Sequence, residues 1–148
     1  IDWNQWQEDQ KLLVEEFISG RELTVAVMGD KALGITELIP KSDFYDFEAK
    51  YTDGKTLHQC PALIDEHVSA KVMQYAELAH KTLGCRGISR SDFRYDDTNG
   101  KPGNIFMLEI NTQPGMTSFS LVPEQAAEAG ISFAGLVEWM VSQARFDN

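Results

Sequence analysis

Two strand-length segments joined by a turn-rich stretch constrain the fold of this chain more than any other feature. Residues 85–95 and 104–111 are strand candidates, and residues 96–103 between them read Asp-Asp-Thr-Asn-Gly-Lys-Pro-Gly. Aspartate, asparagine, proline and glycine favour turns. The two segments are therefore expected to form an antiparallel pair of strands.

Further strands and two helices are predicted around this pair. Residues 22–28 and 32–39 flank Gly29-Asp30 and predict a hairpin, and residues 12–18 predict another strand that ends at Ser19-Gly20. Apolar residues at helical spacing predict a helix over residues 65–83, and Ser132 is expected to cap a second helix. The expected core faces of these helices are Val68, Val72, Tyr75, Ala76, Ala79 and Leu83, and Phe133, Leu136, Val137, Met140, Val141 and Ala144. Because the strands connect mainly as hairpins, the expected fold class is α+β, with a largely antiparallel sheet flanked by helices.

Residues 41–61 form the longest segment in which apolar residues recur at neither helical nor strand spacing. They are aromatic and charged, and a loop of this length in a compact domain is more often functional than a plain connection. We expect a lid or an ordered surface loop.

Chain length, charge and cysteine spacing limit the classes of function. The 148 residues contain no linker, so residues 1–148 are expected to form one domain with an irregular start at residues 1–11. The first residue is Ile1, and we expect a fragment of a longer protein. The net charge of −10 argues against binding to nucleic acid, and the apolar runs are too short to cross a membrane. Cys60 and Cys85 lack the spacing of a zinc or redox motif, and without a signal peptide a cytoplasmic location is expected.

Charged side chains gather on one face of the predicted strand pair. Side chains alternate along a strand, so Arg90, Asp92 and Arg94 share a face. If Tyr95 pairs with Asn104, Arg90 lies opposite Glu109 and Asp92 opposite Met107. This register places Asp92, Glu109 and Asn111 on one face.

Two interpretations of this polar face are open. Carboxylate and amide oxygens are ligands for Mg²⁺, which is commonly shared with nucleotide phosphates, so Mg-ATP is one expected occupant. Alternatively, Arg90 and Glu109 form a cross-strand ion pair on a solvated face. The polar segment of residues 112–118, with its hydroxyls and backbone N–H groups, favours a binding site.

Four ordered blocks of sequence resemble one enzyme family. Residues 108–123, Leu-Glu-Ile-Asn-Thr-Gln-Pro-Gly-Met-Thr-Ser-Phe-Ser-Leu-Val-Pro, are similar to the carboxy-terminal signature of D-alanine:D-alanine ligases, which belong to the ATP-grasp superfamily. Residues 83–87 with Arg90 and Asp92, residues 44–51, and residues 14–20 with Glu22 resemble three more blocks. The resemblance runs in order from residue 12 to residue 144.

The resemblance implies a role for particular residues. Magnesium or manganese would be held by Asp92, Glu109 and Asn111. ATP would be contacted by Glu15, Glu16, Phe17, Ile18, Glu22, Phe44, Lys50 and Leu108. Within that set the backbone of Glu15 and Ile18 would read the adenine edge, and Glu22 would bind the ribose. The catalytic and substrate-binding residues would be Arg90, Gly115, Ser120, Tyr51 and Leu121.

The family resemblance also implies a reaction. ATP would phosphorylate one D-alanine, and the amine of a second D-alanine would attack the acyl phosphate, giving a dipeptide for peptidoglycan precursors. The amino-terminal and central lobes of such ligases would be missing partners, so this piece is expected to be inactive alone. A ligase that uses D-lactate or D-serine and a non-catalytic nucleotide- or metal-binding module are the alternatives, and a homodimer is left open.

Overall fold

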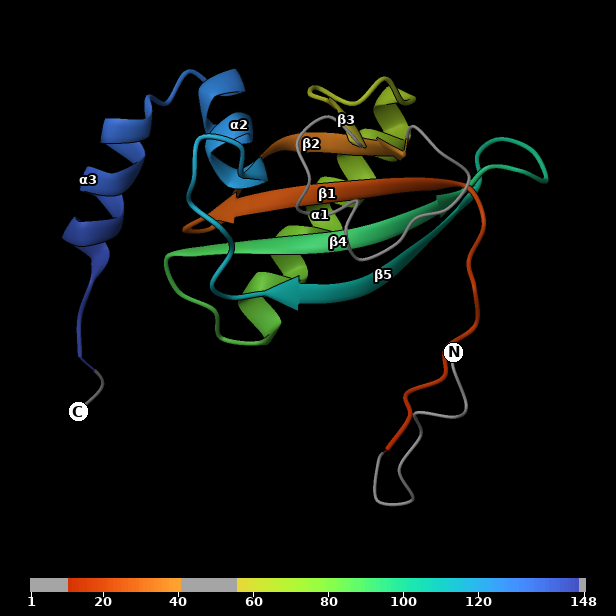
Figure 1. Ribbon diagram of the computed structural model, residues 1–148, viewed down its shortest axis with the longest axis horizontal. Helices are drawn as coiled ribbons and strands as arrows, with labels where there is room; N and C mark the ends of the chain where they lie inside the picture. The colour runs from red at the N-terminus through yellow and green to blue at the C-terminus, as the bar shows by residue number, and fades with distance from the viewer. Residues whose placement is uncertain (1–10, 41–55, 147–148) are drawn as a thin grey trace, which may run out of the picture.

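The chain folds around a five-stranded antiparallel sheet. A computed structural model describes residues 11–40 and 56–146. The strand order in the sheet is β3-β2-β1-β4-β5 (Figure 1). The elements are β1 (Arg21–Met28), β2 (Lys31–Pro40), β3 (Thr56–Gln59), α1 (Glu66–Thr82), β4 (Ile88–Asp96), β5 (Asn104–Asn111), α2 (Leu121–Glu128) and α3 (Phe133–Gln143). The expected α+β class with an antiparallel sheet is confirmed.

The hairpin of β1 and β2 has the turn that the sequence predicts. Met28 pairs with Lys31 across Gly29-Asp30. Gly29 has a φ of 62°, in the left-handed region that glycine adopts readily. Its N–H donates to the carbonyl of Gly87 at 2.8 Å, which ties this turn to the start of β4.

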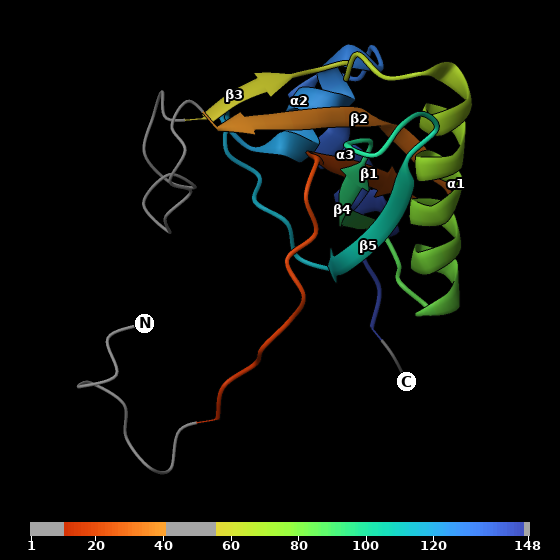
Figure 2. The same cartoon turned by 90° about the vertical axis from the view of Figure 1, so that its right-hand side faces the viewer.

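One face of the sheet is covered by α1 (Figure 2). Asp65 caps this helix and accepts a hydrogen bond from the N–H of His67 at 2.9 Å. Val68 and Val72 of α1 pack with Val25 and Phe93 of the sheet in one core cluster. The predicted helix is therefore confirmed, but the prediction for Leu83 is wrong. It is 64 % exposed because it lies at the helix end, beyond the sheet contact.

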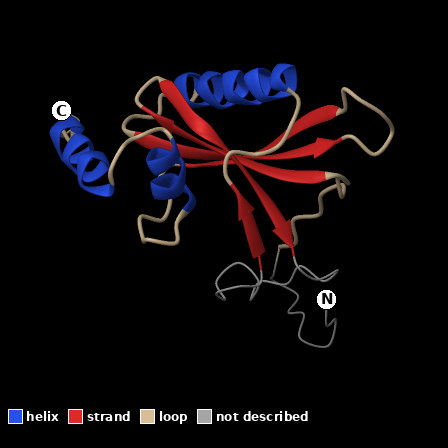
Figure 3. Cartoon of the chain, turned by 90° about the horizontal axis from the view of Figure 1, so that it is seen from above, coloured by secondary structure: helices blue, strands red, loops and turns tan. Residues whose placement is uncertain are grey.

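The opposite face is covered in part by α2 and α3, as Figure 3 shows from above. Val122 and Ala126 of α2 and Leu136 of α3 pack with Ala26 and Ile88 of the sheet. The sequence did not predict α2, whereas α3 begins after Ser132 as expected.

The apolar stripe of α3 is largely exposed, so its prediction as a core face is wrong for most of its residues. Leu136 is buried, but Phe133 is 52 % exposed and Val141 is 71 % exposed. The helix α3 lies at one end of the sheet rather than across its face (Figure 1). The described residues therefore cover only one narrow side of α3.

Two local predictions are corrected in the segments next to β1 and β2. Residues 12–18 form no strand, and Leu13 and Phe17 are 82 % and 84 % exposed. A strand requires a neighbour for its backbone hydrogen bonds, and within the described part of the chain this segment has none. In contrast, Thr56–Gln59 of the predicted loop forms β3 on the edge of β2. Residues 41–55 of that loop lie outside the described residues.

Membrane-spanning helices are not found in the described parts of the chain. None of the helices there combines the length and the apolar character that a transmembrane segment needs.

Candidate functional site

The register of β4 and β5 brings the predicted site residues together, although it differs from the register expected. Asp96 pairs with Asn104, so the strands are offset by one residue from the predicted pairing of Tyr95 with Asn104. The ladder then shifts between Asp92 and Phe93, because β5 carries one extra residue, Leu108. A bulge of this kind leaves its extra residue unpaired and breaks the alternation of faces.

Asp92 and Glu109 lie directly opposite each other as a result. Arg90 is opposite Asn111. Side chains at directly paired positions share a face of the sheet, with Cβ atoms about 4.5–5.5 Å apart. Arg90, Asp92, Glu109 and Asn111 therefore form one polar cluster, which we call the β4–β5 cluster.

The Asp92 carboxylate is held firmly within this cluster. Its Oδ1 accepts hydrogen bonds from Thr24 Oγ1 at 2.8 Å and Arg90 Nε at 2.9 Å, and its Oδ2 accepts one from the second Arg90 nitrogen at 2.8 Å. The forked geometry is the strong form of an arginine–carboxylate pair. Arg90 therefore binds Asp92 of its own strand through this fork. A carboxylate accepts about four hydrogen bonds, so Oδ2 of Asp92 retains capacity for a cation.

Glu109 and Asn111 complete the oxygen ligands of the cluster. Glu109 is exposed and Asn111 half-buried. Asn111 Oδ1 accepts a hydrogen bond from the N–H of Gln113 at 2.9 Å, which turns the chain at the end of β5. Across residues 11–40 and 56–146, no three His, Cys, Asp or Glu side chains are grouped to hold a metal ion. The third oxygen of the β4–β5 cluster comes from an amide, and amide oxygens are ordinary ligands for Mg²⁺ and Ca²⁺.

Arg94 joins the segment that precedes β1 to the same face of β4. Its Nε donates to the carbonyl of Ile18 at 2.9 Å, and a terminal nitrogen donates to the carbonyl of Gly20 at 2.8 Å. Its other terminal nitrogen lies 3.7 Å from the Glu22 carboxylate. The guanidinium also lies over the Phe17 ring, 5.7 Å from the centroid. Three of the predicted nucleotide residues, Phe17, Ile18 and Glu22, are therefore gathered around Arg94.

The loop from β5 to α2 brings Gly115 and Ser120 together. A Cβ atom added at Gly115 would lie 2.8 Å from Ser120 Oγ, so a larger residue would displace that hydroxyl. Ser120 Oγ accepts a hydrogen bond from the N–H of Thr117 and contacts Thr117 Oγ1, both at 2.9 Å. Ser120 is the residue before Leu121, the first residue of α2. Backbone N–H groups at a helix start are unpaired within the helix and suit an anionic ligand.

The remaining predicted residues are not gathered into the β4–β5 cluster. Glu15 and Glu16 lie in the exposed segment before β1, and Leu108 is the bulge residue and 52 % exposed. The other predicted site residues, Phe44, Lys50 and Tyr51, lie outside the described residues.

Sequence reasoning missed three residues that organise this face: Thr24, Arg94 and Gln125. The Thr24 hydroxyl donates a hydrogen bond to the Asp92 carboxylate. It is a polar residue within an otherwise mostly apolar strand, and that was a usable signal. Arg94 was placed on the correct face without a role. Gln125 of α2 is fully buried against β1, and no signal marked it without a prediction of α2.

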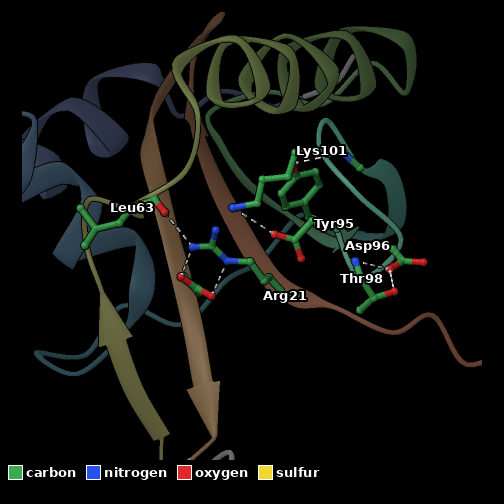
Figure 4. Close-up of polar contacts among 9 residues, drawn as sticks. Arg21, Leu63, Tyr95, Asp96, Thr98 and Lys101 are labelled. Carbon is green, nitrogen blue, oxygen red and sulfur yellow. Dashed lines mark hydrogen bonds and ion pairs between the residues drawn. The ribbon is translucent and has the colours of Figure 1, made fainter.

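Two other polar features lie away from the cluster. Arg21 Nε donates to Glu37 Oε1 at 2.7 Å, and a terminal nitrogen donates to the Leu63 carbonyl at 2.9 Å (Figure 4). Arg21 pairs with Tyr95, so it faces α1 rather than the β4–β5 cluster. A hollow of about 350 Å³ also lies along α1, lined by Asp30, Gln74, Glu77, Leu78 and Lys81. Neither feature contributes to the candidate site.

These elements define an α+β domain of the ATP-grasp carboxy-terminal type, in which polar side chains line the sheet face left open beside α2. The family model described as "D-ala D-ala ligase C-terminus" matches residues 4–142. The chain belongs to this family.

Sequence relatives carry the same family name. A D-alanine--D-alanine ligase of Erythrobacter litoralis is 60 % identical over 139 residues, covering 94 % of this chain and 43 % of the relative. One of Rhizorhabdus wittichii is 57 % identical over 139 residues, covering 94 % of this chain and 44 % of the relative. The chain thus spans less than half the length of these curated relatives.

Solved structures share the fold. The D-alanine--D-alanine ligase from Bacillus anthracis complexed with ATP is 29 % identical, with a TM-score of 0.71 over 87 % of this chain and 41 % of that structure. The VanG D-Ala:D-Ser ligase from Enterococcus faecalis is 32 % identical, with a TM-score of 0.71 over 86 % of this chain and 37 % of that structure.

Proposed function

We propose that this chain is the nucleotide- and magnesium-binding part of a longer, cytoplasmic D-alanine:D-alanine ligase that makes a peptidoglycan precursor. The observation that carries the proposal is the direct pairing of Asp92 with Glu109 beside the Arg90 fork. The names of the relatives supply the reaction. As one domain of that ligase, residues 1–148 would need the amino-terminal and central lobes as partners, because the relatives are more than twice as long.

The metal-binding role rests on the ligand chemistry of the β4–β5 cluster. Asp92, Glu109 and Asn111 would hold Mg²⁺ or Mn²⁺ through oxygen atoms, as hard cations prefer. Such an ion, when bound, neutralises charge on the phosphate oxygens of ATP. Thr24 and Arg90 fix the Asp92 carboxylate in place. Arg90 also balances its charge.

The nucleotide role rests on the segment bound by Arg94. The backbone of Glu15 and Ile18 would read the adenine edge, Glu16 and Phe17 would lie beside the base with Leu108, and Glu22 would bind the ribose hydroxyls. Glu22 pairs with Arg94 in the sheet register, so the ribose would lie between the base segment and the β4–β5 cluster. Phe44 would wall the adenine, and Lys50 would bind the phosphates.

The substrate-binding role rests on the β5–α2 loop. The Gly115 N–H and Arg90 would stabilise the oxyanion that forms when the amine of the second D-alanine attacks the D-alanyl phosphate. Ser120 and Leu121 would bind the carboxylate of that D-alanine, because the hydroxyl lies beside the start of α2. Tyr51 would cover the site, and the segment predicted as a loop over residues 41–61 would exclude water from the acyl phosphate.

Titration calorimetry of the 148-residue chain tests the nucleotide and metal sites. Wild type is expected to bind ATP more tightly with Mg²⁺ than without it. Glu109→Ala is expected to weaken Mg-ATP binding by about tenfold or more, because it removes one charged ligand. Glu138→Ala, which removes an exposed acid on α3, is the matched control and is expected to bind as wild type does. If Glu109→Ala bound Mg-ATP as tightly as wild type, Glu109 would not be a metal ligand, and the proposal would be contradicted.

A coupled assay tests whether the chain is only part of the enzyme. We expect no D-alanine-dependent release of ADP from the isolated chain, since the other lobes are expected to supply further phosphate and substrate contacts. Release of ADP under these conditions would refute this part of the proposal.

The second substrate is the feature that a related enzyme would change. The structural match to the VanG D-Ala:D-Ser ligase favours one specific alternative, D-serine as acceptor, and D-lactate is another. Comparing D-alanine, D-serine and D-lactate as acceptors across pH in the intact ligase distinguishes the three. Preferential use of D-serine or D-lactate would replace the proposed substrate while leaving the nucleotide site in place.

A further inference from the structure

Arg94 is one of three residues of β4 that contact the segment before β1; the others are Tyr95, which packs against Gly20, and Asp96, which is hydrogen-bonded to Ser19. The described side-chain polar contacts of Arg94 go to this segment, at the carbonyls of Ile18 and Gly20, and to the start of β1, at the carboxylate of Glu22. Its guanidinium lies over the ring of Phe17, 5.7 Å from the centroid. One side chain therefore touches four residues across a stretch of six positions, and arginine suits this because its donors have a fixed planar arrangement.

The backbone around Gly20 is fitted closely to the end of β4. Gly20 has a φ of 94°, and a Cβ atom there would lie 2.3 Å from the Tyr95 carbonyl oxygen. Backbone therefore meets backbone at this point, next to the two carbonyls that Arg94 binds. In contrast, the described chain up to and including Phe17 is exposed, with Leu13 82 % and Phe17 84 % exposed. Burial of this segment thus begins at Ile18, whose carbonyl Arg94 binds.

We infer that Arg94 is a positioning residue that selects the base of the bound nucleotide, an inference that rests on the proposed function. By binding the Ile18 carbonyl, Arg94 turns that acceptor toward β4 and away from an incoming base. The N–H of Ile18 is then the group of this residue that remains to read the base edge. A backbone donor matches adenine, whose N1 accepts a hydrogen bond, and opposes guanine, whose N1 carries a proton. Loss of Arg94 frees the Ile18–Ser19 peptide to rotate and to present its carbonyl to guanine.

The inference predicts a particular pattern of binding constants. We compare wild type with Arg94→Met, which keeps much of the apolar stem but removes the donors. Arg94→Met is expected to bind Mg-ATP about tenfold or more weakly and to lose most of the preference for Mg-ATP over Mg-GTP. Binding of magnesium tripolyphosphate, which lacks base and ribose, is expected to change by less than about twofold. Arg94→Lys is expected to bind Mg-ATP with an affinity between those of wild type and Arg94→Met, because an ammonium cannot reproduce the planar fork.

Lys101→Met is the matched control. Lys101 is a cation in the β4–β5 turn whose side chain is 74 % exposed and lies 3.9 Å from Asp97. Its removal changes the net charge as Arg94→Met does, without touching the segment before β1. It is expected to leave the preference for Mg-ATP over Mg-GTP unchanged.

Chymotrypsin cleavage tests the structural part of the inference without a ligand. Phe17 and Leu13 are similarly exposed, but of the two Phe17 contacts Arg94 and adjoins Ile18, whose carbonyl Arg94 binds. The ratio of cleavage after Phe17 to cleavage after Leu13 is expected to rise severalfold in Arg94→Met and to stay constant in Lys101→Met. Cleavage after Leu13 serves as the reference within the same chain.

The outcomes separate this inference from the proposed function. If wild type binds Mg-ATP and Arg94→Met binds it equally well, with the same preference over Mg-GTP, the inference is wrong and the proposed function stands. Parallel loss of ATP and tripolyphosphate binding would also overturn it, since that pattern indicates general damage. If wild type does not bind Mg-ATP, the proposed function fails and the inference fails with it. An unchanged cleavage ratio in Arg94→Met overturns the inference whatever the nucleotide results.

Discussion

Replacing Gln125 with leucine is expected to destabilise the whole domain, because this side chain satisfies buried backbone groups at the centre of the sheet. Its Oε1 accepts from the N–H of Ala26 at 2.7 Å. Its Nε2 donates to the Thr24 carbonyl at 3.1 Å and to Thr36 Oγ1 at 3.2 Å. Gln125 is 0 % exposed, so water does not replace these bonds in the variant.

The size of the effect follows from the groups left behind. Leucine fills a similar volume, so little cavity forms, but an unsatisfied buried donor or acceptor costs about 1–3 kcal/mol. The Ala26 N–H loses its side-chain partner outright, while the Thr24 carbonyl and the Thr36 hydroxyl lose one of their partners. Allowing about 1 kcal/mol for the apolar burial gained, we expect Gln125→Leu to lower the free energy of unfolding by about 2–4 kcal/mol. That is a large part of the roughly 5–15 kcal/mol typical of a domain.

Urea denaturation followed by far-ultraviolet circular dichroism measures this loss. The same change corresponds to a fall in Tm of about 4–16 °C for a chain of this size. Gln74→Leu, on an exposed position of α1, is the matched control and is expected to stay within about 0.5 kcal/mol of wild type. A loss below about 1 kcal/mol in Gln125→Leu would show that its hydrogen bonds are replaced, and the reasoning would be refuted.

Three further perturbations follow from contacts in the fold. Gly20→Ala is expected to lose more stability than Gly130→Ala in urea denaturation, by about 1 kcal/mol or more. Both glycines have positive φ, but only at Gly20 would the new Cβ meet backbone; equal losses would contradict this. Leu136→Ala is expected to cost about 2–5 kcal/mol, since Leu136 is 0 % exposed, and Val141→Ala, 71 % exposed, is the control. Burial lowers the pKa of His80 below its ordinary value, so the unfolded chain binds the proton more readily. Stability is therefore expected to fall as pH decreases below about 6.5. The free energy of unfolding is expected to depend less on pH in His80→Gln than in wild type. If it changed equally in both between pH 7.5 and 5.5, this role of His80 would be refuted.

Local sequence patterns predicted the elements that depend on local interactions. The β1–β2 hairpin follows from Gly29-Asp30, and α1 follows from apolar spacing between Asp65 and Gly84. Capping by Ser132 is confirmed by its bond to the N–H of Gly135 at 3.1 Å. In each case the deciding contacts lie within a few residues of one another.

The missed elements had weaker or non-local signals. β3 is four residues long and gains its partners from β2. α2 is eight residues long, but Ser120 before it and Pro123 in its first turn are typical of a helix start and could have been used. The predicted strand at residues 12–18 shows the converse error. Its apolar pattern is strand-like, but a strand also needs a neighbour, which a single sequence does not reveal.

The bulge at Leu108 explains why the polar face was predicted correctly from an incorrect register. Near the turn, Asp96 pairs with Asn104, and continuing this pairing without a bulge would place Asp92 opposite Leu108 and turn Glu109 toward α1. The extra residue resets the alternation, so Glu109 faces Asp92 again. The predicted register was offset by one residue at the turn and by a further residue beyond the bulge. An offset of two restores the same face, because side chains alternate with a period of two. The agreement at Asp92 and Glu109 therefore depends on the bulge, which places the two carboxylates at directly opposed positions of paired strands.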